Sequence, residues 1–228
     1  YSADISLAPG TYQFKVASAD WSTVDFGAAQ GDEAVVLDMA KTLAQTGANM
    51  TVNIEQGDTY SFRLDAINPG APVLTVSQKR PFGTNTVLLR GEMNGWDEST
   101  PFTYLGNGLY SVAQSLTAGT YQFKAATGDW STVNLGGVEG GDTEVTVGNS
   151  LWIEHGGNPP NLSATIEADG EFDFVIDGQF TARPTLFVFV ANDWDNDGTV
   201  NAEDSDIDGD GVENALDAFP INKLESVD

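Results

Sequence analysis

The sequence predicts an all-β protein that consists of two tandem immunoglobulin-like antiparallel β-sandwiches and a C-terminal segment of a different kind. Short runs of alternating polar and apolar residues, separated by glycine-rich turns, predict many short strands. A stretch of sequence that occurs twice predicts two copies of one module. Carboxylates concentrated near the C-terminal end indicate a third part. Many short strands with turns between them are typical of β-sandwiches.

The repeat defines the expected domain organisation. Residues 10–15 (GTYQFK) recur as residues 119–124, and residues 20–24 (DWSTV) recur as residues 129–133. This period is too long for a solenoid repeat, and 228 residues suffice for two domains of ordinary size. The predicted parts are a first module at residues 1–78, a linker at 79–85, a second module at 86–190 and the distinct segment at 191–228.

The individual strands are predicted from alternation. The runs that satisfy it are residues 11–16, 59–64, 87–90, 120–125, 144–147, 171–176 and 185–190. Residues 33–45 have a helix-like pattern, but the corresponding part of the second copy contains Gly148-Asn149 and Leu151-Trp152. We therefore expect a strand with a loop at this place in both copies.

The two copies differ at their N-terminal ends. Tyr1 is the counterpart of Tyr110, and the second copy has a further predicted strand, residues 87–90, upstream of Tyr110. The first copy thus lacks an opening strand, which would leave an unpaired edge and a strip of core exposed. Two explanations stay open: the chain was cut or processed here, or a neighbouring chain donates the strand by β-augmentation.

The composition excludes several classes of function. A net charge of −25 repels phosphate backbones and anionic membranes, so nucleic-acid binding is excluded and a neutral or cationic partner is expected. No apolar run is long enough for membrane insertion. The chain has no cysteine and a single histidine, His155, so no disulfide, thiol chemistry, zinc site or Ser-His-Asp triad is expected. We expect a non-catalytic protein.

The C-terminal segment has the pattern of a calcium site. Two stretches, which begin at Asp193 and Asp206, fit D-x-D-x-D-G-x-x-N-x-x-D. Oxygen ligands at positions 1, 3, 5 and 12, with a glycine turn at position 6, suit Ca²⁺. The predicted ligands are Asp193, Asp195, Asp197, Asn201 and Asp204 in the first loop and Asp206, Asp208, Asp210, Asn214 and Asp217 in the second. A disordered acidic tail is the alternative, but two loops in register argue against it.

The two loops, together with DAFP at residues 217–220, resemble the thrombospondin type 3 repeats of bacterial extracellular proteins. An EF-hand pair would require flanking amphipathic helices and a longer interval between loops. The resemblance implies a stiff spacer whose folding depends on calcium. It also implies a secreted or extracellular protein, because such sites bind calcium at about 10⁻⁴ to 10⁻³ M. Trp194, inside the first loop, is expected to pack the spacer against the second sandwich.

The second copy resembles starch-binding proteins. Residues 87–97 (VLLRGEMNGWD), 119–124 (GTYQFK) and 128–130 (GDW) are similar to the glycogen-binding domain of the AMP-activated kinase β subunit, and closer still to the starch-binding modules of bacterial pullulanases and α-amylases. The resemblance covers nearly all of residues 86–190 and, in shortened form, residues 1–78. It implies binding of starch-like α-glucans, which include glycogen and maltooligosaccharides.

The resemblance assigns candidate sugar-binding residues. It implies that Trp96 and Trp130 stack on glucose rings, that Lys124 donates hydrogen bonds to sugar hydroxyls and that Asn158 adds a further hydrogen bond. An indole offers a broad apolar surface to the flat face of a pyranose ring, and two indoles set at an angle suit a curved α-glucan. Each tryptophan also has the plain alternative of covering the edge of a core.

Further candidates are less firmly tied to the motif. Trp152 lies near the Gly-Gly-Asn loop in sequence, although packing is the alternative for it, and His155 is expected at the rim of the sugar site. Lys15, Trp21 and Asn49 are the candidate equivalents in the first copy, where no equivalent of Trp96 is present.

Two functional hypotheses follow. The first is a non-catalytic carbohydrate-binding region that recognises starch-like α-glucan, an accessory part of a secreted glycoside hydrolase or of a surface protein. The alternative is an extracellular structural or adhesive protein that assembles by β-strand donation and is stiffened by calcium.

Overall fold

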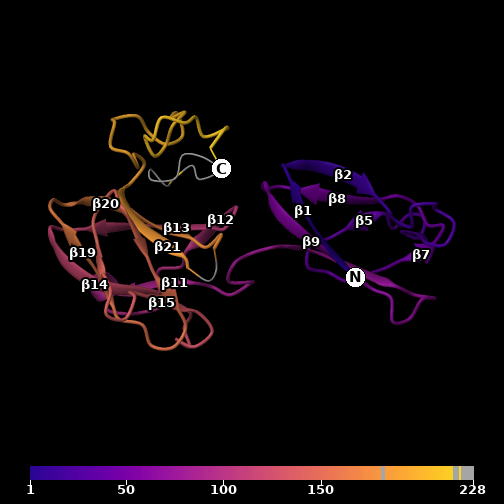
Figure 1. The fold of residues 1–228 in the computed structure, drawn as a ribbon, viewed down its shortest axis with the longest axis horizontal. Coiled ribbons are helices and arrows are strands. Elements are labelled where there is room, and N and C mark those ends of the chain that lie inside the picture. Colours follow the sequence, from indigo (N-terminus) through magenta and orange to yellow (C-terminus); the bar gives the residue numbers. More distant parts are fainter. Residues whose placement is uncertain (181–182, 218–220, 222–228) are drawn as a thin grey trace. The chain divides into compact units, whose positions relative to one another are not determined.

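The computed structural model describes residues 1–180, 183–217 and 221, so residues 218–220 and 222–228 of the predicted C-terminal segment lie outside the described residues. The chain divides into two compact units, Tyr1–Arg80 and Pro81–Asp228 (Figure 1). The boundary between them falls within the predicted linker at residues 79–85.

The first unit contains ten strands in two layers. One layer is the sheet β1-β9-β10-β6, and the other consists of the three-stranded sheets β2-β8-β5 and β3-β4-β7. The strands are β1 (Ser2–Leu7), β2 (Gly10–Phe14), β3 (Val16–Ala17), β4 (Asp25–Gly27), β5 (Ala34–Val35), β6 (Lys41–Thr42), β7 (Ala44–Gln45), β8 (Met50–Ile54), β9 (Asp58–Asp65) and β10 (Val73–Gln78).

The second unit has the same plan with more strands. One sheet has the order β12-β13-β20-β21-β17, and the other has the order β16-β19-β14-β15-β18, with β11 paired to β14 as well. The elements are β11 (Leu88–Gly91), the 3₁₀ helix η1 (Glu92–Asn94), β12 (Thr103–Gly106), β13 (Leu109–Leu116), β14 (Gly119–Ala126), β15 (Asn134–Gly136), β16 (Glu144–Val145), β17 (Ser150–Trp152), β18 (Glu154–His155), β19 (Leu162–Ile166), β20 (Gly170–Asp177) and β21 (Thr185–Val190).

Alternating apolar residues on the facing strands build the two cores. In β19 the buried positions are Leu162, Ala164 and Ile166, with more exposed residues between them, as the period of two requires. The two layers meet in edge-to-face aromatic pairs, Phe123–Phe174 with ring centroids 5.1 Å apart and Phe14–Phe62 at 5.3 Å. The repeated sequence therefore produces a repeated core contact.

The prediction of an all-β, antiparallel sandwich fold is confirmed. The strand pairs are antiparallel except for two short pairs, β5 with β8 and β16 with β19. Residues 33–45 form β5, β6 and β7, as expected of a strand region with loops. The described part of the chain contains no helix of the length and apolarity needed to cross a membrane.

Strand β21 is apolar on both of its faces. Leu186 and Val188 point into the sandwich core, whereas Phe187 and Phe189 form an outer cluster with Val175 of β20. The outer cluster is covered by Trp194, Ile207 and Ile221 of the acidic segment, which lies next to this sheet in Figure 1. The run LFVFV at residues 186–190 therefore lacks alternation because both sides of the strand are buried.

Strand β11 completes the core of the second unit. Leu88–Gly91 pairs with residues 123–126 of β14, and Val87 and Leu89 are fully buried in the core. In the first unit, whose residues 1–80 are all described, no strand occupies the equivalent edge of β2 and β3. The difference expected from the sequence is thus present in the structure.

Replacing Leu89 by alanine should lower the free energy of unfolding of the second unit by about 3 kcal/mol, because the change leaves a cavity in a close-packed core. Urea unfolding followed by far-UV circular dichroism measures this loss. The control is Leu105→Ala on β12, where the side chain is 43% exposed and the change should stay below about 0.5 kcal/mol. Equal losses in the two variants would contradict the role assigned to β11.

Candidate functional site

The second unit has a shallow, open depression of about 440 Å³ on the side of β14. Its lining residues are Trp96, Lys124, Trp130, Asn134, Gly157, Asn158 and Asn161. They come from the turn after η1, from β14, from the turn before β15, from β15 itself and from the connection between β18 and β19. Four of the predicted sugar-binding residues, Trp96, Lys124, Trp130 and Asn158, are therefore close together.

A hydrogen-bonded turn holds Trp130 at the rim. The Asp129 carboxylate accepts hydrogen bonds from the hydroxyls of Thr127, Ser131 and Thr132 and from the backbone N–H groups of Ser131 and Thr132. These hydrogen bonds, with that from the Thr127 hydroxyl contributing most, hold the pKa of Asp129 well below its usual range. Trp130 has φ 57°, a left-handed backbone that bulky residues rarely adopt. The repeated hydroxyl residues thus fix the turn that presents the indole.

A second turn presents Trp96. The Asn94 side chain closes this turn, because its Nδ2 donates to the Leu89 carbonyl at 2.7 Å while its Oδ1 accepts from the Gly91 N–H at 3.0 Å. Trp96 also has a left-handed backbone, with φ 64°. The ring centroids of Trp96 and Trp130 lie 6.2 Å apart, with 37° between the ring planes. The two indoles form one angled aromatic surface.

Arg90 of β11 connects the two turns. Its Nε and Nη2 donate to the Trp96 carbonyl at 3.0 and 2.7 Å, and its Nη1 donates to the Gly128 carbonyl at 3.4 Å. The guanidinium carbon lies 4.2 Å from the Trp130 ring centroid, in a cation–π contact. Glu98 is 3.6 Å from the same guanidinium. Arg90 is buried and acts as a positioning residue for both indoles.

Lys124 supplies a buried cation at the depression. Its side chain is only 5% exposed, and burial lowers its pKa from the ordinary lysine value. Its one hydrogen bond among the described residues is a long one, from Nζ to Asn158 Oδ1 at 3.4 Å. Asn134 donates to the Gly157 carbonyl, but its buried Oδ1 has no hydrogen-bond partner in the described part of the chain. A ligand with hydroxyl groups would satisfy both of these polar atoms.

The equivalent region of the first unit is electrostatically different. Lys15 forms an ion pair with Asp25, and Asp25 occupies the place that Asn134 has in the second unit. Trp21 has the same left-handed turn as Trp130, with φ 58°, but it is 59% exposed. The first unit therefore offers a neutralised lysine and a single exposed indole.

Hydrogen-bond register changes one of the expected equivalences. In the first unit the Thr46 N–H donates to the Asp25 carbonyl, and the Ala28 N–H donates to the Ala48 carbonyl. The matching bonds of the second unit run from the Gly156 N–H to the Asn134 carbonyl and from the Gly137 N–H to the Pro160 carbonyl. One residue separates Thr46 from Ala48, whereas residues 157–159 separate Gly156 from Pro160. Asn49 thus corresponds to Asn161, and Asn158 belongs to a loop extension that the first unit lacks.

The structure places two other candidates away from the indole pair. Trp152 lies on β17, which pairs with β21 in the opposite sheet, and its ring stacks on the guanidinium of Arg183 at 3.3 Å. His155 lies on β18, next to β15, with its Nε2 3.4 Å from the Thr132 carbonyl oxygen. Neither residue lines the depression.

Sequence reasoning missed Arg90, Asn134 and Asn161. Arg90 is the last residue of a predicted strand, residues 87–90, and no sequence pattern indicates which groups its side chain contacts. Asn134 directly follows the repeated DWSTV motif, where the first copy has an aspartate, so this difference between copies was a visible signal.

The acidic segment folds into two loops with the same internal hydrogen bonds. The Gly198 N–H donates to Asp193 Oδ2 at 3.1 Å, and thirteen residues later the Gly211 N–H donates to Asp206 Oδ2 at 2.9 Å. Both glycines have positive φ, 94° and 97°, which a turn at position 6 requires. Two loops with one geometry show that this segment has a defined backbone.

Three carboxylates converge in each loop. One oxygen from each of Asp193, Asp195 and Asp197 lies within 4.8 Å of the others, and the same holds for Asp206, Asp208 and Asp210. Asn201 and Asn214 were predicted as ligands, but their side-chain oxygens accept hydrogen bonds from the backbone N–H groups of Trp194 and Ile207. In this structure the two asparagines hold the loops closed.

Asp208 is the most deeply buried of these carboxylates. Its side chain is 4% exposed, and its Oδ2 has no hydrogen-bond partner among the described residues. Burial, followed by the charge of Asp210, raises the pKa of Asp208 to about 6. Oδ atoms of Asp193, Asp204 and Asp210 are likewise buried without a described partner. Converging, unpartnered carboxylate oxygens are the donor set that a hard divalent cation prefers.

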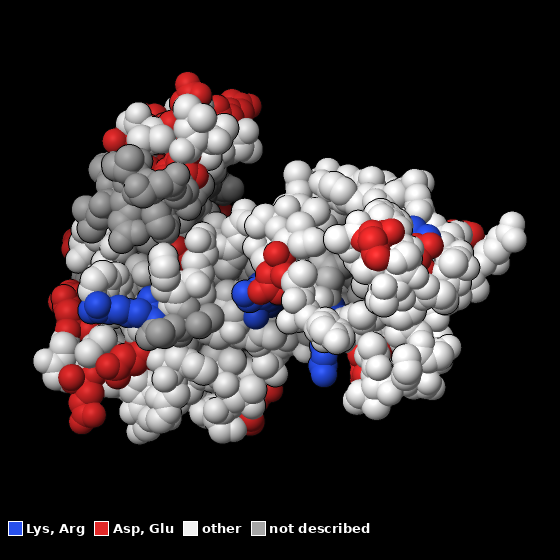
Figure 2. Space-filling model, turned by 45° about the vertical axis from the view of Figure 1, so that its right-hand side comes forward, with Lys and Arg blue, Asp and Glu red and all other residues white. Residues whose placement is uncertain are grey.

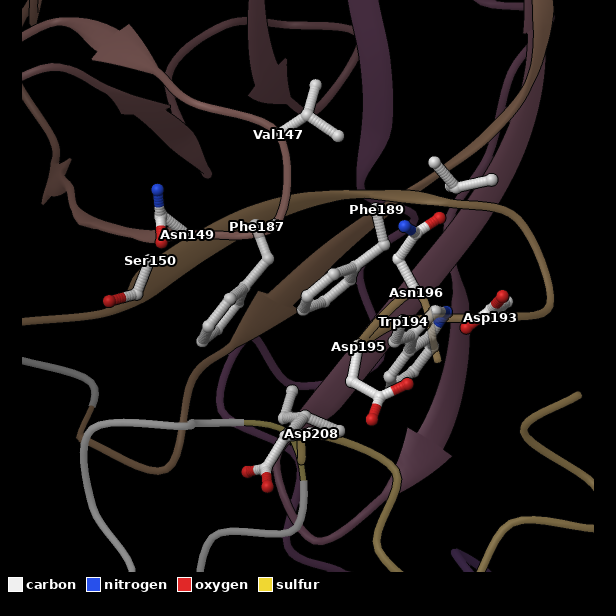
Figure 3. A pocket seen from close by; sticks show the side chains of 13 residues that line it. Val147, Asn149, Ser150, Phe187, Phe189, Asp193, Trp194, Asp195, Asn196 and Asp208 are labelled. Carbon is white, nitrogen blue, oxygen red and sulfur yellow. The ribbon is translucent and has the colours of Figure 1, made fainter. Parts of the chain in front are cut away.

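Trp194 joins the acidic segment to the sandwich. Its ring stacks on Phe189 at 5.0 Å, and Phe189 stacks on Phe187 at 5.2 Å. The Trp194 Nε1 donates to Asp173 Oδ2 of β20 at 2.9 Å. Figure 3 shows these rings in a row beside Asp195 and Asp208. The packing expected of Trp194 is present, and it ties the loop backbone to the outer face of β21.

Comparisons with known proteins do not identify a family. No protein-family model matches the chain, and no curated protein matches it. A solved structure described as "Ligand induced structure of AmyP-SBD" aligns with 46% of this chain and 72% of that chain, at 16% identity and a TM-score of 0.37. A likeness at this level carries no argument about the function of this protein.

Replacing Arg90 by alanine should release both indoles, because the variant loses the bonds to the Trp96 carbonyl and the stacking on Trp130. We expect loss of the near-UV circular dichroism signal of the coupled indole pair and a fall in unfolding free energy of about 2 kcal/mol. Arg183→Ala, which removes the arginine that stacks on Trp152, is the matched control. An unchanged near-UV spectrum in Arg90→Ala would show that Arg90 does not position the indoles.

Proposed function

We propose that the second unit is a non-catalytic carbohydrate-binding module for starch-like α-glucan, part of a secreted bacterial protein. The observation that supports this most directly is the angled pair of Trp96 and Trp130 above a buried lysine and an unpartnered asparagine oxygen. Aromatic rings stack on the apolar faces of sugars, and nearby polar groups fix the hydroxyls. An interplanar angle of 37° suits a ligand that curves between consecutive rings better than a flat chain does.

The charge distribution favours a neutral ligand. The formal net charge is −25, and basic side chains form only small groups among the acidic ones on the face shown in Figure 2. A polyanion would be repelled by this surface, whereas an uncharged polysaccharide would not. Lys124 can still donate to a sugar hydroxyl in its charged form, because no described carboxylate forms an ion pair with it.

The first unit is proposed to contribute little to glucan binding. The Lys15–Asp25 ion pair occupies the lysine, and Trp21 has neither a second indole nor an arginine beside it. An exposed single indole supports at most weak stacking. The two units would therefore differ in affinity although they share the GTYQFK and DWSTV motifs.

A second proposed function, calcium binding by the acidic segment, is favoured by the buried and unpartnered Oδ2 of Asp208. Ca²⁺ would be held by Asp193, Asp195, Asp197 and Asp204 in one loop and by Asp206, Asp208, Asp210 and Asp217 in the other. Bound calcium would neutralise the converging carboxylates and so stabilise the packing of Trp194 on Phe189. Calcium sites of the extracellular type fill at about 10⁻⁴ to 10⁻³ M calcium; we therefore propose that the protein is extracellular.

Trp130→Ala should abolish retardation of the full chain in affinity electrophoresis on amylopectin, and calorimetry should show at least a tenfold loss of affinity for maltoheptaose. The physical reason is the loss of half of the stacking surface, worth roughly 1.5 to 3 kcal/mol. The wild-type dissociation constant is expected in the micromolar to millimolar range.

Two variants serve as matched controls for this experiment. Trp152→Ala removes an exposed indole from the opposite sheet, and Trp21→Ala removes the one in the first unit; both should leave the affinity nearly unchanged. A wild-type chain that no α-glucan retards would reject the proposed function, and equal losses in Trp21→Ala and Trp130→Ala would reject its assignment to the second unit.

Removing calcium with a chelator should expose Trp194, seen as a red shift in its fluorescence, and should speed proteolysis of residues 193–217. Asp208→Asn should shift the midpoint of a calcium titration upward at least tenfold, because the most buried proposed ligand loses its charge. The control Glu203→Gln removes a charge from an exposed position in the same segment and should not shift the midpoint. Identical fluorescence and proteolysis with and without calcium would rule out the site.

A further inference from the structure

The second unit has an open pocket of about 590 Å³ at one end of its sandwich, between β16 and the turn that joins β19 to β20. Its apolar wall consists of Val145, Val147, Phe172 and Val190, and Val190 is 40% exposed. A volume of this size lies within the range of pockets that hold small organic molecules. The pocket is separate from the depression with the two indoles, because the two share no lining residue.

Carboxylates surround the opening of this pocket. The rim glutamates Glu144, Glu167 and Glu171 line it together with Asp169, and all four residues are exposed. Asp169 accepts a hydrogen bond from the Ala118 N–H, whereas the rim glutamates form no ion pair within the described part of the chain. No lysine or arginine of the described residues lines the pocket. The opening thus combines an apolar wall with carboxylates that have no cation beside them.

The two units can be compared at this end because their strands have the same register. Tyr60 of β9 pairs with Gln78 of β10, and Phe172 of β20 pairs with Val190 of β21. Each of these rings stands two residues before the phenylalanine that β9 or β20 contributes to the edge-to-face core pair. Gln78 and Val190 therefore occupy equivalent positions.

In the first unit, side chains of the chain itself cap this end. Gln78 Nε2 donates to Gln56 Oε1 at 3.1 Å and to Asp58 Oδ2 at 2.9 Å. Arg80 Nε in turn donates to Gln78 Oε1 at 3.0 Å. Tyr60, at the bottom of this network, is only 1% exposed. Nitrogen donors and a guanidinium group thus occupy the place that is open in the second unit.

The second unit lacks both the cap and the internal cation. The residues Gln56, Asp58, Gln78 and Arg80 have the counterparts Ala168, Gly170, Val190 and Asn192. The rim differs in the opposite sense, since Ala34, Gly57 and Thr59 have the counterparts Glu144, Asp169 and Glu171. Glu167 has a carboxylate, Glu55, as its counterpart. The second unit therefore has more carboxylates around this opening and no arginine of its own beside them.

We propose that this pocket binds a small organic cation, an ammonium or guanidinium group attached to an apolar body. The apolar body packs against the apolar wall, and the charged group stays at the opening beside the rim glutamates. The charged group replaces the guanidinium that Arg80 supplies in the first unit. A ligand of this kind buries its apolar part while its charge remains hydrated and paired, as lysine and arginine side chains do on protein surfaces. The site does not depend on glucan binding or calcium binding elsewhere in the second unit.

The test uses the full chain with calcium present, so that the acidic loops do not compete for the probe. Calorimetry with n-hexylammonium chloride should show saturable one-to-one binding. Hexanoate has the same chain length and the opposite charge, and it should not bind. Ethylammonium keeps the charge but has four fewer methylene groups, and it should bind roughly tenfold more weakly or worse because less apolar surface is buried.

A variant that combines Glu144→Gln, Glu167→Gln and Glu171→Gln should weaken hexylammonium binding roughly 10- to 100-fold, because each exposed ion pair contributes a few-fold. The matched control combines Glu139→Gln, Glu154→Gln and Glu203→Gln, which changes the net charge equally at exposed positions outside the pocket. The control should keep its affinity within about twofold, because distant surface charges are screened. Equal losses in the two variants would indicate attraction to the net charge alone and would overturn the proposal.

A third variant builds the cap of the first unit into the second by combining Ala168→Gln, Gly170→Asp and Val190→Gln. A side chain fits at position 170, because a Cβ there would only touch the Phe172 ring, at 3.4 Å. This variant should lose hexylammonium binding while its far-UV circular dichroism spectrum stays that of the parent chain. The proposal is wrong if the parent chain does not bind hexylammonium, if hexanoate binds equally well, or if the folded cap variant binds like the parent.

Discussion

The packing of β11 against β14 is the interaction on which most of the second unit depends. Val87 and Leu89 close the core between the two layers, and the next residue, Arg90, reaches the Trp96 carbonyl and the Trp130 ring. Leu89 on one face of this short strand is therefore buried in the core, and Arg90 on the other face positions the two indoles. Alternation along a strand makes this possible, because consecutive side chains point to opposite faces.

The first unit shows the same motif without this strand. Trp21 keeps the left-handed turn and the aspartate that braces it, since Asp20 accepts hydrogen bonds from Ser18 and Ser22. It has no second indole and no guanidinium beside it, and Asp25 neutralises Lys15. The hydrogen bonds of the turn are thus sufficient to present one tryptophan. A surface of two rings beside a lysine without an ion pair requires, in addition, strand β11 with the turn that follows it, and an asparagine at position 134 where the first unit has Asp25.

The acidic segment and the sandwich form one packed assembly in the second unit. Phe187 and Phe189 would be an exposed apolar patch if Trp194 and Ile207 did not cover them. The covering residues lie inside loops whose carboxylates repel one another without a cation. Calcium in these loops would consequently act on the stability of the whole unit, because binding to the folded state alone raises its free energy of unfolding.

Much of the structure could be predicted from the sequence because it depends on local physics. Alternation predicts the strands, and the repeated GTYQFK and DWSTV motifs predict two modules whose Phe123–Phe174 and Phe14–Phe62 contacts coincide. The spacing of aspartates and glycines predicts loops whose hydrogen bonds repeat after thirteen residues. Side-chain hydrogen bonds that span two to five residues depend little on the rest of the fold.

The sequence by itself determined the fold class, the two copies, the tryptophan-bearing turns and the acidic loops, since each follows from residues near one another in the chain. Only the tertiary structure decided that Arg90 braces both indoles, that Trp152 lies on the opposite sheet and that Asn49 corresponds to Asn161. These outcomes depend on strand register and on which sheet edges meet. The physical reason is that pairing between distant strands is chosen by the burial of the whole core, which no short stretch of sequence encodes.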